Sequence, residues 1–307
     1  MRRIKNRVIV NADDLGMSRS ANEAIRRAHL EGVLTSASVV VPGEAYRHAL
    51  DRCVGECPRL GIGLHFSLTA GRAVAPRNQI PLLVDEAGIF THTFSSLCKA
   101  LRSAQKNDLL AQIRIELHSQ IAQAVADGLR LDHINGERHI HLIPQIFGLV
   151  AEAASSWGIS FVRTIRESSW NFVRLAQYGT ILKTGGFLKC AVLGHWSRVN
   201  IRSGVFHGMT ADHFIGLLLS GKMYKIMDRV LLKPPPGVTE IMVHPGLPNG
   251  NKDEDRLVTA AIRKYLQSID RVMEFDSCIG RRIGPSVDLI RFQDLGESFA
   301  SLSLQTV

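Results

Sequence analysis

Two adjacent carboxylates, Asp13 and Asp14, follow an apolar run in the segment VIVNADDLG of residues 8–16. An apolar run of this kind is typical of a buried strand, so the carboxylates are expected at its end. One of two neighbouring carboxylates can bind a divalent metal ion while the other removes a proton from activated water. An acidic turn is the structural alternative, and the pair alone does not decide between them.

A second group of residues that could do chemistry lies in the segment DHINGERHIH of residues 132–141. It holds three His, one Asp and one Glu within ten residues, in a chain with twelve His in total. Imidazole and carboxylate groups are the usual ligands of catalytic metal ions. The density predicts a metal-binding or catalytic role for the segment, with candidates at His133, Asn135, Glu137, His139 and His141.

Three further side chains stand at the ends of apolar runs. His65 closes GIGLHF, and its imidazole could bind a metal ion or a core carbonyl group. His244 precedes Pro-Gly at the end of TEIMVHPG, and it could donate a proton or serve only the packing of the core. Arg163 could hold Asp13 ionised, or it could belong to a basic segment that begins at the same place.

The elements that must position these residues alternate along the chain. Apolar runs predict strands at about 7–12, 35–41, 60–66, 130–135, 159–164 and 238–244, with a last short strand near 272–276. Helical patterns fall at about 19–31, 44–54, 107–127, 143–157 and 252–268.

Repeated strand–helix units predict an α/β fold with parallel strands and right-handed crossovers. We expect one (β/α) barrel-like domain over 1–307, resembling a TIM barrel that is distorted, with a basic helical insertion at about 168–235. In such a barrel the carboxyl ends of all strands share one face, where the chemistry is located. The polar residues at the strand ends would then converge.

Composition excludes several classes of protein. The chain of 307 residues is 45% apolar and 21% charged, which is typical of a globular protein with a sizeable core. No apolar stretch reaches the roughly 18–20 residues that span a bilayer. The basic start leads directly into the first strand and does not resemble a signal peptide. Five cysteines without a CxxC pair favour free thiols and a cytoplasmic location.

The net charge of +9 is concentrated in one part of the chain. Residues 163–233 hold eleven Lys and Arg against three Asp and Glu, together with six Trp and Phe residues. A basic and aromatic segment suits an anionic partner, a lipid-linked substrate or peripheral contact with the inner face of a membrane. A solvated insertion is the alternative. No nucleic-acid-binding motif is present, and the sequence leaves a homodimer open.

The motifs NADDLG, GLH, HINGERHIH and MVHPG, in this order, resemble those of the YdjC-like carbohydrate deacetylases. This family includes chito-oligosaccharide deacetylases and the hopanoid-associated HpnK proteins. The resemblance runs over about 7–166 and returns at about 238–295. It implies a (β/α) barrel-like fold and the removal of an N-acetyl group from a sugar with the help of a divalent metal ion.

The resemblance also implies roles for single residues. Asp13 would be the base, Asp14 and His65 would be metal ligands, and His244 would donate a proton. The third ligand of the family is a His, and the matching position here is Glu137. Compared with a further His, a carboxylate in this place favours Mg²⁺ or Mn²⁺. Alternatively, His139 replaces it as the ligand, or the metal site is lost.

The leading hypothesis is therefore an N-deacetylase that acts on an N-acetylated amino sugar or glycan with one divalent ion, Mg²⁺ or Zn²⁺, with Mn²⁺ as a further candidate. Substrate binding is assigned to the rest of the second group, His133, Asn135 and His141. Asn135 replaces an Asp of the chito-oligosaccharide subgroup and is shared with the hopanoid-like subgroup. Two alternatives remain: a metallohydrolase of another ester class, and a non-catalytic or altered-metal relative that binds a sugar or a partner.

Overall fold

The computed structural model describes residues 6–169, 172–174, 179, 181–182, 185–248 and 264–296. Its central feature is one parallel sheet with the strand order β5-β4-β3-β2-β1-β7-β6, and β8 pairs with β1. The strands are β1 (Asn6–Leu15), β2 (Ser36–Val39), β3 (Gly61–Phe66), β4 (Leu131–Gly136), β5 (Phe161–Val162), β6 (His213–Ile215), β7 (Val238–Val243) and β8 (Val287–Leu289).

The sheet curls so that its two outer strands approach each other. Isolated parallel bridges join Phe161 to Met209 and Glu167 to Phe214, which connects the chain at and after β5 to β6 and the segment before it. Hydrogen bonds accompany these bridges, including Phe214 N to Arg166 O at 2.9 Å. The predicted barrel-like α/β fold is confirmed, and the carboxyl ends of the strands meet around one opening.

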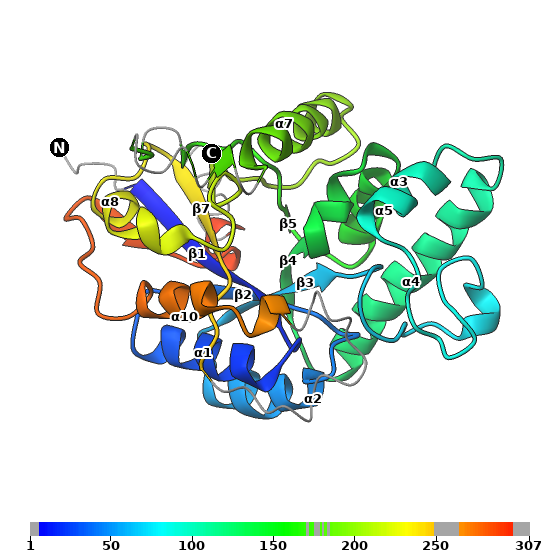
Figure 1. Ribbon diagram of the computed structural model, residues 1–307, viewed down its shortest axis with the longest axis horizontal. Helices are drawn as coiled ribbons and strands as arrows, with labels where there is room; N and C mark the ends of the chain where they lie inside the picture. The colour runs from blue at the N-terminus through cyan, green and yellow to red at the C-terminus, as the bar shows by residue number, and fades with distance from the viewer. Residues whose placement is uncertain are drawn as a thin grey trace, which may run out of the picture.

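Helices pack outside the sheet and agree closely with the predicted ones (Figure 1). They include α1 (Arg19–Leu30), α4 (Lys106–Ala126) and α5 (Pro144–Ser156), while the predicted helix at 44–54 is divided into α2 (Tyr46–Ala49) and the π-helical η1 (Leu50–Val54). The irregular stretch after β3 carries η2 (Arg77–Gln79) and α3 (Phe94–Ala100). Ser18 caps α1 by accepting from the Ala21 amide at 3.1 Å, as its position predicts.

The predicted basic insertion contains more than helices. It carries α7 (Gly186–Arg202), η6 (Met223–Lys225) and α8 (Met227–Leu232), and also strand β6 of the central sheet. A strand of three residues is too short to show a period of two in the sequence. The segment therefore both completes the sheet and places α7 across the top of the molecule as drawn in Figure 1.

One expected strand is a helix. The strand predicted near 272–276 is part of α10 (Ile269–Asp276), and this prediction was wrong. Ser268 caps α10 by accepting from the Asp270 amide at 3.2 Å. A short run with few apolar residues shows little period of either kind, and the cap was not recognised. Most of the helix predicted at about 252–268 lies outside the described residues.

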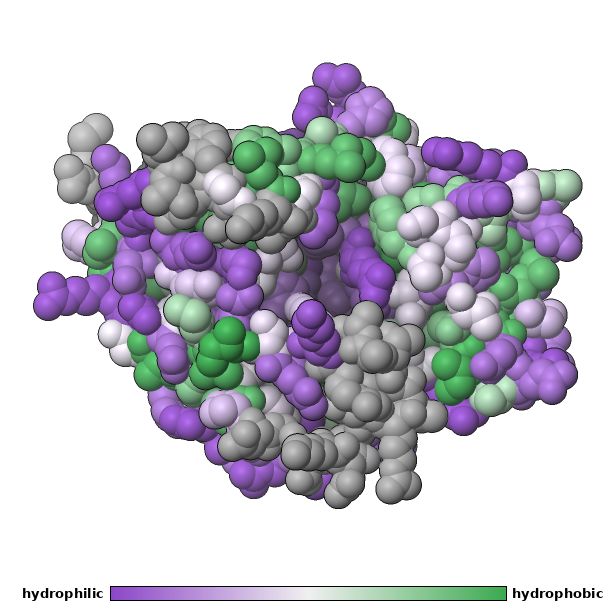
Figure 2. Space-filling view, in the orientation of Figure 1, coloured by the Kyte–Doolittle hydropathy of each residue, from purple (hydrophilic) through white to green (hydrophobic). Residues whose placement is uncertain are grey.

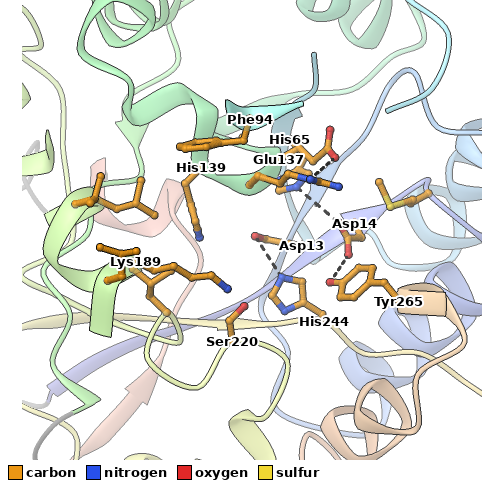
Figure 3. A pocket seen from close by; sticks show the side chains of 17 residues that line it. Asp13, Asp14, His65, Phe94, Glu137, His139, Lys189, Ser220, His244 and Tyr265 are labelled. Atoms are coloured by element: carbon orange, nitrogen blue, oxygen red, sulfur yellow. Dashed lines mark hydrogen bonds and ion pairs between the residues drawn. The ribbon is translucent and has the colours of Figure 1, made fainter. Parts of the chain in front are cut away.

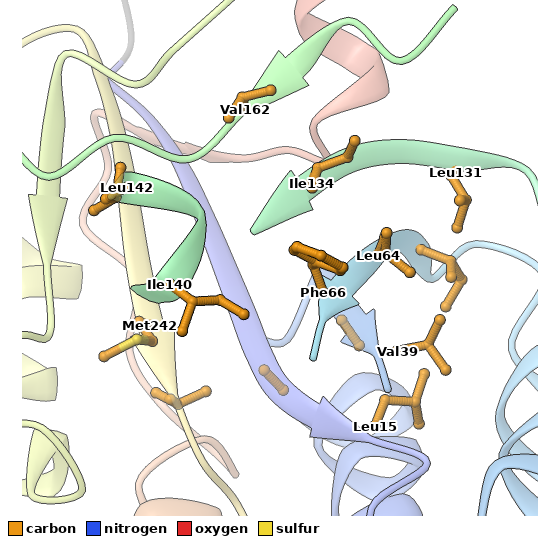
Figure 4. Close-up of a cluster of buried hydrophobic side chains, with 14 of the residues drawn as sticks. Leu15, Val39, Leu64, Phe66, Leu131, Ile134, Ile140, Leu142, Val162 and Met242 are labelled. Carbon is orange, nitrogen blue, oxygen red and sulfur yellow. The ribbon is translucent and has the colours of Figure 1, made fainter. Parts of the chain in front are cut away.

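The core fills the space between strands and surrounding helices. Side chains from β1, β2, β3, β4 and β7 pack with those of the 3-10 turn η3 (Glu137–Leu142), as Figure 4 shows for Leu15, Val39, Phe66, Ile140 and Met242. The five cysteines are free thiols, as predicted. Within the described residues, no helix combines the length and the apolar character needed to cross a membrane.

Candidate active site

Asp13 lies at the end of β1 and is held by a buried set of donors. Its Oδ1 accepts from Asn11, Ser38, Asn135 and Arg163 at 2.7–3.2 Å, whereas Oδ2 accepts only from Arg163 among the described residues, at 2.7 Å. Burial opposes ionisation, but Arg163, His65 and His244 together outweigh it and hold the pKa of Asp13 well below its usual value. Asp13 is therefore a carboxylate, and Oδ2 is the oxygen left with capacity to accept a proton.

Arg163 follows β5 and connects two strands of the barrel interior. It is fully buried, and its Nε donates to Glu240 of β7 at 2.7 Å while its two terminal nitrogens bind Asp13. Burial alone would lower the pKa of Arg163, but the two carboxylates raise it. The sequence-based prediction that Arg163 steadies Asp13 agrees with this geometry.

His65 and Asp14 face each other across the opening. His65 Nε2 is 3.7 Å from Asp14 Oδ1, and His65 Nδ1 is 2.6 Å from Asn135 Oδ1. Since an amide oxygen only accepts, His65 Nδ1 is the donor, and in the neutral tautomer with that proton Nε2 has its lone pair toward Asp14. This is the tautomer that a metal-binding imidazole needs.

Asp14 has an unusual backbone and two anchors on its second oxygen. Its φ of 71° lies in the left-handed region, which is rare for a residue other than glycine and is typical of functional sites. Arg271 donates to Oδ2 at 2.8 Å, and the Tyr265 hydroxyl donates to the same atom at 3.0 Å. Burial opposes ionisation, but Arg271, His244 and His65 together outweigh it and lower the pKa of Asp14. Oδ1 is thus directed toward His65.

His244 follows β7 and approaches the two carboxylates from the other side of the opening (Figure 3). Its Nε2 is 4.0 Å from Asp13 Oδ2, and its Nδ1 is 3.7 Å from Glu274 Oε2. Burial would lower the pKa of His244, but Glu274, Asp14 and Asp13 together raise it above its ordinary value. A raised pKa favours the protonated imidazole, and an imidazolium beside an ionised carboxylate makes an acid–base pair.

The turn η3 carries the residues of the HINGERHIH motif that reach the opening. Arg138 and His139 both have left-handed backbones, with φ of 49° and 61°. Glu137 Oε2 accepts from Ser67 Oγ at 2.6 Å, and its Oε1 is 3.5 Å from Arg138 Nε. Burial and Arg163 hold the pKa of His139 well below its usual value, so its imidazole is neutral. His139 Nδ1 is buried and has no hydrogen-bond partner among the described residues.

The residues assigned to substrate binding lie behind the opening. His133 is fully buried, with Nδ1 2.6 Å from Asp132 Oδ1, and it packs against Gly63, where a Cβ atom would come within 2.3 Å of its ring. His141 Nε2 is 3.1 Å from the Arg163 carbonyl oxygen. Asn135 links His65 to Asp13. Their placement gives these three residues supporting contacts, and none of them lines the described cavity.

A divalent ion fits part of this donor set. The tautomer of His65 and the position of Asp14 Oδ1 suit two ligands of one ion. Among the residues that the structure describes, however, no group of three His, Cys, Asp or Glu side chains is spaced to hold a metal ion. Glu137 is held by Ser67 and His139 stands apart, so either would have to move to complete the site.

The opening leads into a cavity of about 640 Å³, a volume that suits a small molecule (Figure 3). One side holds the polar site, and the other is largely apolar. The apolar wall is made mainly by α7, α3 and the segment before η6, with Phe94, Leu188, Val192, Leu193 and Leu217. Figure 2 shows the hollow in this face, with hydrophobic side chains gathered above it over α7. Lys189 extends from α7 into the cavity (Figure 3).

Four residues around the site were not found from the sequence: Arg271, Glu274, Tyr265 and Lys189. The first two lie on α10, which was read as a strand, and their spacing of three on a capped helix was the available signal. Tyr265 falls beside the segment outside the described residues. Lys189 belongs to the basic segment, in which no single cation stands out by its neighbours in sequence.

Comparison with known proteins gives this site a family context. The model of the family described as YdjC-like protein matches residues 7–284. A carbohydrate deacetylase of Brevibacillus brevis is 37% identical over 153 residues, which cover 50% of this chain and 57% of that protein. A chitooligosaccharide deacetylase of Proteus mirabilis is 38% identical over 148 residues, or 48% of this chain and 54% of that protein.

The matched part of the chain thus spans little more than half the length of these curated relatives. The crystal structure of a proposed cellobiose-phosphate cleavage protein from Enterococcus faecalis has the same fold, with a TM-score of 0.66 over 95% of this chain and 99% of that one, at 20% identity. Since the family model covers most of the sequence, the chain belongs to the YdjC-like protein family.

Proposed function

We propose that the protein is a metal-dependent deacetylase that removes the N-acetyl group of an amino sugar or glycan. One observation carries the proposal. The ionised Asp13 and His244, whose pKa is raised, face each other at 4.0 Å beside the Asp14–His65 pair, at the end of a cavity. The names of the two curated relatives support the N-acetylated sugar as substrate.

Asp13 and His244 divide the proton transfers of amide hydrolysis. Asp13 Oδ2 takes a proton from the attacking water, whose oxygen bonds to the acetyl carbon. The C–N bond then breaks with its electron pair on nitrogen, and His244 Nε2 donates a proton to that nitrogen. The products are acetate and the free amine. Arg163 keeps the base in the anionic form, and the cavity wall separates the reacting groups from bulk water.

A metal ion is part of the proposal because Asp13 is a weak base. A carboxylate with so low a pKa removes protons slowly from ordinary water. A divalent ion held by Asp14 and His65 would lower the pKa of water and polarise the acetyl carbonyl group. Glu137 stands at the sequence position of the family's third ligand and is the first candidate for that role. An oxygen ligand there favours Mg²⁺ or Mn²⁺.

Acetate release from a panel of N-acetylated sugars and oligosaccharides, with and without a chelator, tests the proposal. We expect release that a chelator abolishes and added metal restores. Phosphate release from phosphoesters without acetate release would instead favour a metallohydrolase of another class. If the protein binds N-acetylated glycans, releases no acetate and retains no metal, it is a non-catalytic relative.

We further propose that the sugar is carried on a lipid and that the protein acts at the inner face of a membrane. The apolar wall of the cavity continues onto exposed side chains at and before α7, where Leu182, Phe187 and Leu188 are 68%, 37% and 70% exposed. An apolar aglycone lying there would leave the sugar beside Asp13. The basic character of 163–233 favours an anionic lipid surface.

This refinement is tested by Leu188→Asp, with Leu30→Asp as the control. Leu30 is also exposed, at 54%, but it lies on α1 away from the cavity. We expect Leu188→Asp to raise KM for a lipid-linked substrate while KM for a water-soluble N-acetylated oligosaccharide stays unchanged. Equal effects of the two substitutions, or no preference of the wild type for the lipid-linked substrate, would contradict the refinement.

A further inference from the structure

Helix α10 (Ile269–Asp276) sends two charged side chains into the site from outside the barrel. Arg271 and Glu274 are one turn apart on the same helix, and their exposed fractions are only 2% and 0%. Ionised groups are rarely buried so completely unless each has partners. Arg271 has the carboxylate of Asp14, the proposed metal ligand, as its partner. Glu274 has the backbone amide of His244, the proposed proton donor, as its partner.

Arg271 joins Asp14 to the turn that follows His244. Its NH1 donates to Asp14 Oδ2 at 2.8 Å and its NH2 to the Pro245 carbonyl oxygen at 3.2 Å. The Gly246 amide in turn donates to the Arg271 carbonyl oxygen at 3.1 Å. A Cβ atom at Gly246 would come within 3.1 Å of Arg271 Cβ, so the glycine leaves room for the arginine.

Glu274 holds the backbone at His244 and lies beside its ring. Glu274 Oε2 accepts from the His244 amide at 2.6 Å, and Oε1 accepts from the Met223 amide at 2.7 Å. His244 Nδ1 is buried, has no hydrogen-bond partner among the described residues, and lies 3.7 Å from Glu274 Oε2. At 3.7 Å this contact is longer than a hydrogen bond, but the charge of Glu274 favours a proton on the Nδ1 that faces it.

We propose that Glu274 is the positioning residue of His244: it holds the backbone at His244 and places its charge beside Nδ1, so that Nε2 faces the leaving nitrogen. This inference rests on the proposed function for the direction of proton transfer, but not for the contact itself. Arg271 positions Asp14 in the same way, by a hydrogen bond to its carboxylate. Helix α10, outside the barrel, thus sets the distance between the proposed proton donor and the proposed metal-binding carboxylate.

Other charged groups also face His244 and must be counted in any test. Asp13 and Asp14 approach it from β1, Glu274 and Arg271 lie on α10, and the Tyr265 ring is centred 6.1 Å away. Among these, only Glu274 is placed next to Nδ1, whereas Asp13 lies next to Nε2. A change that neutralises Glu274 therefore tests the Nδ1 side alone.

The experiment measures the pKa of His244 by NMR in protein with ¹⁵N-labelled histidine, assigned through His244→Asn, in wild type, Glu274→Gln and Ser277→Ala. Ser277 is the control because its hydroxyl donates to the Glu274 carbonyl oxygen at 2.7 Å and carries no charge. We expect Glu274→Gln to lower the pKa by about one unit or more, since it removes an anion within 4 Å. Ser277→Ala should leave it unchanged.

Activity gives a second readout. The alkaline limb of the kcat profile should move to lower pH in Glu274→Gln by the same amount. Glu274→Asp keeps the charge but withdraws it by one methylene group. It should therefore retain most of the rise in the His244 pKa and reduce kcat with little change in KM. This variant also serves if the glutamine variant does not fold.

An unchanged His244 pKa in folded Glu274→Gln, or an equal change in Ser277→Ala, would overturn the inference. The NMR result decides it whether or not a substrate is known. Absence of acetate release by the wild type, combined with the expected NMR shift, would overturn the proposed function and leave the positioning contact supported.

Discussion

Replacing Arg163 by Met should both destabilise the protein and abolish activity at the site. The guanidinium is fully buried and makes bonds of 2.7 Å to both oxygens of Asp13 and to Glu240. Removing one partner of a buried ion pair costs about 3–5 kcal/mol, because the remaining charge is left without compensation. For a chain of 307 residues, whose unfolding entropy is about 2.1 cal/mol/K per residue, the melting temperature should fall by roughly 5–8 °C.

The measurement is calorimetric or urea unfolding of Arg163→Met beside Arg114→Met. Arg114 makes a single ion pair with Glu152 on the surface, where its side chain is 46% exposed, so its loss should cost no more than about 1 kcal/mol. Equal losses in the two variants would show that Arg163 is not the compensating charge of the barrel interior.

The pH dependence of this difference has a fixed sign. The pKa of Asp13 is lowered in the folded protein, so its ion pair with Arg163 stabilises the fold above the unfolded pKa of about 3.9. That stability is lost as the pH falls below this value toward the folded pKa. The gap in unfolding free energy between wild type and Arg163→Met should therefore narrow in acid. A gap that widens in acid would contradict the assignment.

Three further predictions concern the site. Since the pKa of His244 is raised, the alkaline limb of the kcat/KM profile should lie above pH 6.5, and a limb well below 6.5 would contradict His244 as the proton donor. His244→Gln should lower kcat by about 10²–10⁴-fold. Asp14→Asn should weaken metal binding in equilibrium dialysis, whereas Asp85→Asn on the surface should not. Gly246→Ala should lower the melting temperature and kcat, because the added methyl group would crowd Arg271. Unchanged values would show that Arg271 can shift to accommodate the methyl group without loss of stability or activity.

The strand ends that carry the chemistry could be predicted because they depend on short-range pattern. Asp13, Asp14 and His65 each stand near the end of a largely apolar strand, and parallel strands bring such positions to one edge. The structure places them together as predicted, with Arg163 and His244 beside them. The metal ion itself and the roles of Glu137 and His139 stay predictions.

The supporting residues could not be predicted because their roles depend on tertiary contacts. Glu274 binds an amide 30 residues away, and Arg271 binds Asp14 across 257 residues. Their spacing of three on a capped helix places these two side chains on one face, but it does not distinguish them from solvent-exposed charges. For His133 and His141 the motif predicted substrate binding. The structure buries both side chains behind the cavity, where they pack and form hydrogen bonds.

Acetate release by wild type and Asp13→Asn, at equal and verified metal content, tests the central claim most directly. Asparagine preserves the size of the side chain but cannot take up a proton, and Asp14 and His65 remain to hold the ion. We expect metal-dependent release of acetate from an N-acetylated glycan by the wild type and a loss of about 10²–10⁴-fold in kcat in the variant. Full activity of Asp13→Asn would contradict the assignment of the base.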